Sequence, residues 1–112
     1  MQARIRAPMD ARIERFRALV AKDPDNPLHN FALAQALLGA AEHEAAERAF
    51  ARCLELDPQW MVAAIRRGRC LVALQRWDEA RAALDRGAAL AQAQDHDEPW
   101  AEIKELLAQI PA

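Results

Sequence analysis

An Asp-Pro step occurs twice in the sequence, as Asp23-Pro24 and as Asp57-Pro58, and the second lies 34 positions after the first. The residue before a proline avoids the helical conformation, so each step is expected to end a helix. Other residues recur with the same period: Phe16 with Phe50, Leu37 with Leu71 and Ala46 with Ala80. Self-similarity at this period is typical of stacked helical pairs, each of which needs its neighbours to bury its apolar face.

The composition also favours helices. Hydrophobic residues make up 53% of the 112 residues, but aromatic residues only 5%, and there is no tyrosine. Much of the apolar share is alanine, which stabilises helices and lets them pack closely, whereas strands need the β-branched and aromatic residues that are scarce here. We therefore predict one small all-α domain.

Proline, glycine and polar residues mark the ends of the predicted helices. The sequence predicts helices over residues 10–22, 27–38, 42–56, 60–74 and 78–92, and a last helix that begins at Pro99. Asn26 can cap the second helix, with Pro27 in its first turn, and Gly39 is placed to end it. The residues before Met9 show no helical periodicity and are expected to be loose.

The charge pattern argues against some classes of partner. The formal net charge is −2, which provides no broad basic field for a nucleic acid or an anionic membrane. No window has the roughly 18 apolar residues of a spanning helix, and the first residues do not resemble a signal peptide. We therefore expect a cytoplasmic protein that binds neither nucleic acid nor membranes.

The sequence offers no recognisable catalytic or metal site. Cys53 and Cys70 are too far apart for a redox pair or a zinc site, and both lie among apolar residues, so they are interpreted as reduced packing residues. His29, His43 and His96 lie on different segments without the spacing of a metal pair. No phosphate-binding glycine loop is present either. We expect no enzyme activity, no cofactor and no metal.

These residues resemble the tetratricopeptide repeat, a helix-turn-helix unit of 34 residues. The first copy supplies Leu33-Ala34, Leu37, Ala46, Phe50 and Pro58, and the second supplies Gly68, Leu71, Trp77-Asp78-Glu79-Ala80 and Leu84. The resemblance implies a short right-handed α-solenoid of antiparallel helix pairs, with about six helices. It divides the chain into a loose segment (1–8), an N-terminal capping helix (9–24), a first repeat (25–60), a second repeat (61–94) and a C-terminal capping helix (95–112).

The small residues of the pattern have a physical role, and one residue departs from it. Ala34, Ala46, Gly68 and Ala80 are expected where two helix backbones approach too closely for a larger side chain. Arg67 stands where the family has leucine. Either its stem lies along the edge of the core and its head reaches water, or its helix is slightly rotated.

The resemblance also implies a function, because proteins of this family bind peptides or protein segments in a concave groove lined by the first helix of each pair, the A helix. The equivalent positions here are Leu28, Phe31, Gln35, Leu38, Val62, Ile65, Arg66, Arg69 and Val72. This apolar surface with a basic edge suits an apolar segment with an acidic or carboxylate group. Alternatively, the apolar members only pack the helices and the arginines are solvated. The chaperone-tail subfamily has lysine and asparagine at the positions of Phe31 and Gln35, so that specific activity is not expected.

Trp60 and Met61 are not explained by the repeat pattern, since the residue 34 positions before Trp60 is the capping Asn26. Three roles remain open for the indole: burial against the neighbouring turn and the end of the first helix, a homodimer contact, or a contact with a partner. The leading hypothesis is an adaptor that binds a protein or peptide in the groove. The alternative is a self-associating structural protein, a homodimer through Trp60 and Met61 or through the end helices.

Overall fold

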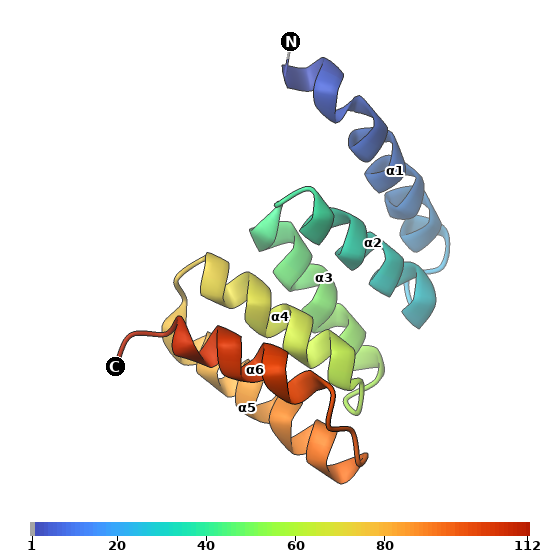
Figure 1. Cartoon of the computed structure of the whole chain (residues 1–112). Helices are drawn as coiled ribbons and strands as arrows, with labels where there is room; N and C mark the ends of the chain where they lie inside the picture. The colour runs from blue at the N-terminus through green and yellow to red at the C-terminus, as the bar shows by residue number, and fades with distance from the viewer. Residues whose placement is uncertain (1) are drawn as a thin grey trace.

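The computed structural model describes residues 2–112, with side chains from Asp10 onward. Its helices are α1 (Gln2–Lys22), α2 (Pro27–Gly39), α3 (His43–Leu56), α4 (Met61–Ala73), α5 (Trp77–Ala93) and α6 (Pro99–Ala108), and no strand occurs in this range. Each helix packs against the next in the chain, and α4 also contacts α6 (Figure 1). The predicted all-α solenoid of about six helices is confirmed.

The first helix is longer than the sequence predicted. It begins at Gln2, so residues 2–8 continue the helix instead of forming the loose segment that we expected. Glutamine, alanine and arginine, which all favour helices, make up most of this stretch, and they outweigh its lack of apolar periodicity. The first turns of α1 extend beyond the end of α2 (Figure 1). Met1 lies outside the described residues.

Polar side chains hold the turn between α1 and α2. Oδ1 of Asn26 accepts a hydrogen bond from the backbone N–H of His29, at 3.1 Å, which confirms the predicted cap. The buried amide of Asn30 donates to the carbonyl of Pro24, at 3.0 Å, and to that of Asn26, at 2.8 Å. These local hydrogen bonds fix the direction in which α2 leaves the turn, without help from contacts distant in the chain.

The end of α2 differs from the prediction, because Gly39 is still helical. The left-handed residue is Ala41, two positions later, with a φ of 59°. The next backbone N–H, of Glu42, donates to the carbonyl of Leu37 at 2.9 Å, which closes the helix with a Schellman motif. Gln75 after α4 and Asp95 after α5 have the same conformation. The hydrogen-bonded turn, and not the presence of a glycine, decides where these helices end.

Two clusters of buried side chains form the core. The first surrounds Phe50 and includes Ile13 of α1, and the second surrounds Leu84 and includes Ile103 of α6. Helix α4 supplies residues to both clusters, for example Cys70 to the first. The end helices therefore belong to the core, one to each cluster.

The helices of a pair approach each other closely at small residues. Ala34, Ala46 and Ala80 have no exposed surface. A Cβ at Gly68 would lie 2.6 Å from Cδ2 of Leu84, and a Cβ at Gly87 would lie 2.8 Å from Cγ1 of Ile65. The small residues are therefore where the sequence predicted close contact.

None of the helices formed by residues 2–112 is long and apolar enough to cross a bilayer.

The left-handed position after α2 is occupied by Ala41 and not by Gly39, which leads to a stability prediction. We expect Ala41→Gly to raise the free energy of unfolding by about 1 kcal/mol, because alanine costs roughly 1–2 kcal/mol in the left-handed conformation. Gly39→Ala is expected to add roughly 0.5–1 kcal/mol, since a Cβ there meets no atom within 4 Å. Urea denaturation measures both. The control Ala18→Gly, at an exposed position of α1, should lower stability by about 1 kcal/mol. A loss of stability in Ala41→Gly would contradict the left-handed assignment.

Candidate functional site

The first helices of the two pairs, α2 and α4, are continued by α6. Helix α6 packs against α5 and α4, and Nη2 of Arg69 on α4 lies 2.7 Å from Oε1 of Glu102 on α6. Figure 1 shows α6 alongside α4. We call the surface formed by α2, α4 and α6 the A-helix face. The helix that was predicted only to cap the second repeat thus also extends the face on which the groove was predicted.

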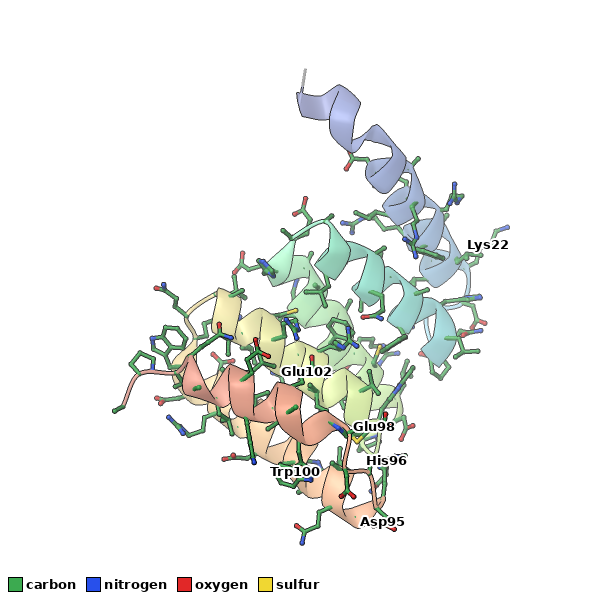
Figure 2. All side chains as sticks on the ribbon, in the orientation of Figure 1. Lys22, Asp95, His96, Glu98, Trp100 and Glu102 are labelled. Carbon is green, nitrogen blue, oxygen red and sulfur yellow. The ribbon has the colours of Figure 1, made fainter. Side chains whose placement is uncertain are left out.

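Two clefts open on the A-helix face. The first, which we call the Arg66 cleft, has a volume of about 400 Å³. It is lined by Met61, Val62, Ile65, Arg66, His96, Glu98, Pro99 and Glu102. Figure 2 shows Glu98 and His96 beside the start of α6. Apolar side chains of α4 thus face a polar wall formed by the α5–α6 loop and α6.

The second cleft, which we call the Trp77 cleft, has a volume of about 570 Å³ and lies at the other end of α4. It is lined by Leu38, His43, Arg69, Val72, Ala73, Gln75, Trp77, Leu106 and Gln109. Arg69 lines this cleft and its partner Glu102 lines the Arg66 cleft. The Arg69–Glu102 ion pair is therefore where the two clefts meet.

The two arginines of the predicted basic edge have different environments. Arg69 is held by Glu102, and the pair is partly exposed. Arg66 is half-buried and forms no ion pair with any carboxylate in the described part of the chain. Glu98 and Glu102 line the same cleft as Arg66, so the cleft carries both signs of charge. Of the two arginines, Arg66 is the one free to bind an added carboxylate.

The structure separates the predicted groove residues into two groups. Leu38, Val62, Ile65, Arg66, Arg69 and Val72 line the clefts, whereas Leu28, Phe31 and Gln35 line neither. Within the clefts, Ile65 is only 3% exposed, because its side chain packs over Gly87 of α5, and Val72 is also buried. Leu28 stands apart at 72% exposed on the first turn of α2.

Trp60 belongs to a row of aromatic rings. Its indole stacks on the ring of Phe31, with the ring centroids 4.7 Å apart and the planes 20° apart. Phe31 in turn meets the ring of Phe50 edge-on, with centroids 5.8 Å apart. Trp60 is half-buried at the edge of the first core cluster. The indole therefore packs on Phe31 of α2, a contact that none of the three roles left open by the sequence had named.

A charged network that the sequence did not predict lies on the opposite side of α4. The side chain of Arg67 is 32% exposed, and its Nε lies 2.9 Å from Oε2 of the buried Glu47. Its helix keeps the expected register, since Gly68 lies against Leu84. Arg76 also contacts Glu47, at 3.4 Å, and binds Glu79 at 2.7 Å. Its hydrogen bond to Glu79 raises the pKa of Arg76 and lowers the pKa of Glu79. The sequence did contain a signal for this network. Glu47 follows Ala46, which was expected to lie in a close helix contact, and a buried carboxylate requires a cationic partner.

The two cysteines are buried, whereas two of the histidines line the clefts. Burial raises the pKa of both thiols, Cys53 and Cys70, to about 11, so they are protonated and unreactive at neutral pH. His43 lines the Trp77 cleft and His96 lines the Arg66 cleft. Among residues 10–112, no three side chains of His, Cys, Asp or Glu gather as a metal site would require.

The aromatic row predicts the effect of removing Trp60. We expect Trp60→Ala to lower the free energy of unfolding by about 2 kcal/mol, because it removes a ring stack and a half-buried indole. Trp60→Phe should keep most of this stability. Urea denaturation followed by circular dichroism measures the change, with Gln59→Ala at the exposed neighbouring position as the control. If Trp60→Ala is as stable as the control, the indole does not contribute to the core.

Solved structures with the same architecture are known. The TPR2B domain of yeast Sti1, in a complex with pHsp70, matches with a TM-score of 0.82 at 16% identity, over 97% of this chain and 87% of that one. The TPR2AB domain of yeast Sti1, in a complex with pHSP90, gives the same TM-score and identity, but this chain covers only 42% of it. The first TPR of Spaghetti (RPAP3), bound to the HSP90 peptide SRMEEVD, matches with a TM-score of 0.76 at 23% identity, over 94% and 82% of the two chains. At these identities the likeness concerns the fold.

Sequence comparison agrees with the repeat assignment. None of the curated proteins matches this chain. The sequence model of the family described as anaphase-promoting complex, cyclosome, subunit 3 matches residues 10–87, which is more than half of the chain. These residues contain most of α1 and both helix pairs up to the middle of α5. The chain therefore belongs to this family, whose helical repeat is the tetratricopeptide repeat.

Proposed function

We propose that the chain is a non-enzymatic interaction module, an adaptor that binds a short peptide or protein segment on the A-helix face. The observation that carries this proposal is the pair of clefts that meet at the Arg69–Glu102 ion pair. An extended segment that runs along α4 can place one side chain in each cleft while its backbone passes over the ion pair. Six of the nine residues predicted for the groove line these clefts, which supports the same surface.

The chemistry of the Arg66 cleft indicates the kind of segment that fits it. Val62 and Met61 offer apolar contact, and Arg66 can bind one carboxylate through two parallel hydrogen bonds. Glu98 and Glu102 lie in the same cleft and would repel a run of acidic residues. The proposed ligand is therefore a largely apolar segment with one carboxylate group, and it is less acidic than the basic edge alone had suggested.

Binding of chaperone tails is not part of the proposal, although two of the structural neighbours were solved with HSP90 segments. The subfamily that binds such tails has lysine and asparagine where this chain has Phe31 and Gln35. The ring of Phe31 lies between those of Trp60 and Phe50, so this position contributes to the core. A carboxylate would find no cation there.

The cellular setting and the alternative function follow from the same residues. Cys53 and Cys70 are free and buried, which suits a reducing compartment, and we propose the cytoplasm. Self-association through Trp60 and Met61 has less support than peptide binding. Trp60 already stacks on Phe31, and Met61 packs against the second core cluster.

The test uses a library of random peptides displayed against the purified chain. We expect the selected peptides to bind the Arg66→Glu variant at least about tenfold more weakly, since a charge-assisted hydrogen bond contributes roughly 1.5–3 kcal/mol. Fluorescence anisotropy of the labelled peptides measures the dissociation constants. Arg81→Glu, which changes an exposed arginine of α5 in the same way, is the control and should bind like the wild type. An equal loss in both variants, or no loss in Arg66→Glu, would refute the proposed site.

A further inference from the structure

The first helix exposes a face that is buried in the other second helices. In α3, three positions of this face have no exposed surface: Ala46, Phe50 and Cys53. The residues 34 positions earlier in α1 are Arg12, Phe16 and Leu19. Arg12 is exposed, Phe16 is only half-buried and Leu19 is 39% exposed. Helix α1 is thus the second helix of a pair, and no helix among residues 2–112 takes the place of the first.

The last helix has the opposite open face. Its sequence Leu107-Ala108-Gln109 repeats Leu33-Ala34-Gln35 of α2. Ala34 has no exposed surface, because α3 covers it, whereas Ala108 is exposed and Leu107 is half-buried. The other side of α6 is buried against the rest of the chain through Ile103 and Leu106, as is Ile110 just after the helix. Helix α6 is thus the first helix of a pair, and no second helix in the described chain covers its outer side.

The register of the complete pairs shows how these two faces match. In the second pair, Gly68 of α4 lies directly against Leu84 of α5. Gly68 is equivalent to Ala34 at the 34-residue period, and Ala108 matches Ala34 through the shared Leu-Ala-Gln sequence. Leu84 is equivalent to Phe50, and hence to Phe16, at the same period. In the same register, α6 would present a small exposed residue to the aromatic ring of α1. This is the combination that allows close approach in the other pairs.

Charge is separated between the two ends of the chain in a complementary way. Residues 2–22 contain six basic and two acidic side chains, a net charge of +4, whereas residues 95–112 contain one basic and five acidic side chains, a net charge of −4. On α1, Arg12, Arg15 and Lys22 are exposed and recur at helical spacing along the open face, beside Leu19. The negative charge of the C-terminal end lies mainly in the loop before α6, at Asp95, Asp97 and Glu98. This end therefore complements the basic helix α1 in charge.

We propose that a second copy of this chain supplies the missing helix, so that α6 of one copy packs against α1 of the next and completes a helix pair. The two surfaces differ, so the contact is heterologous and repeats head to tail. Arg12 stands at the position of Ala46 and keeps the backbones further apart at that end of the pair. The contact is therefore weaker than a pair within one chain, and salt weakens it further by screening the opposite charges.

Sedimentation velocity over a range of protein concentrations, at low and at high ionic strength, tests this proposal. The wild type is expected to form species heavier than the monomer as its concentration rises, and to lose them in high salt. Leu19→Asp blocks the α1 face and Ala108→Arg blocks the α6 face, and each variant alone is expected to be monomeric. Both positions are exposed, so the variants should fold, which circular dichroism checks.

An equal mixture of the two variants distinguishes head-to-tail pairing from every symmetric alternative. One unblocked α6 and one unblocked α1 remain in the mixture, so it should form dimers and nothing larger. Ala82→Arg, at an exposed position of α5, is the control and should associate like the wild type. The proposal is overturned by a wild type that stays monomeric, by association of either blocked variant alone, or by a mixture that remains monomeric.

Discussion

The close approach of the two helices within each pair is the contact on which the rest of the structure depends. At Gly68 the neighbouring helix is so near that a Cβ would lie 2.6 Å from Cδ2 of Leu84, and Ala46 and Ala80 are fully enclosed at the corresponding contacts. Because a packed interior has little free volume, these small residues fix the distance between the helices of a pair. That distance in turn sets how one pair stacks on the next.

Helix α4 links this packing to the candidate site. It gives Ala63 and Cys70 to the first core cluster and Leu71 to the second, so neighbours on several sides hold its orientation. Its remaining side carries Arg66 and Arg69 on the A-helix face. The position of the cationic groups is therefore a consequence of core packing. A rigid helix also lowers the entropy that binding would otherwise cost.

Periodicity in the sequence was enough to predict the helices and their pairing, because the repeat recurs in residues such as Phe50 and Leu84 that define the core. It was not enough where an outcome depends on a partner distant in the chain. Arg67 could be understood only once Glu47 was found beside it, and Trp60 only once Phe31 was found under its ring. The expected groove was only partly predictable for the same reason: the sequence shows which residues lie on α4, but not that Glu102 holds Arg69.

Enlarging the side chains at the helix contacts is the most direct test of the close packing within each pair. Urea denaturation of Ala46→Leu and Ala80→Leu should show a loss of roughly 1–3 kcal/mol in the free energy of unfolding, since neither enclosed position has room for a larger side chain. Ala82→Leu makes the same change at an exposed position of α5 and should stay within about 0.5 kcal/mol of the wild type. If all three variants unfold like the wild type, the helices of each pair are not in close contact and the repeat architecture described here is wrong.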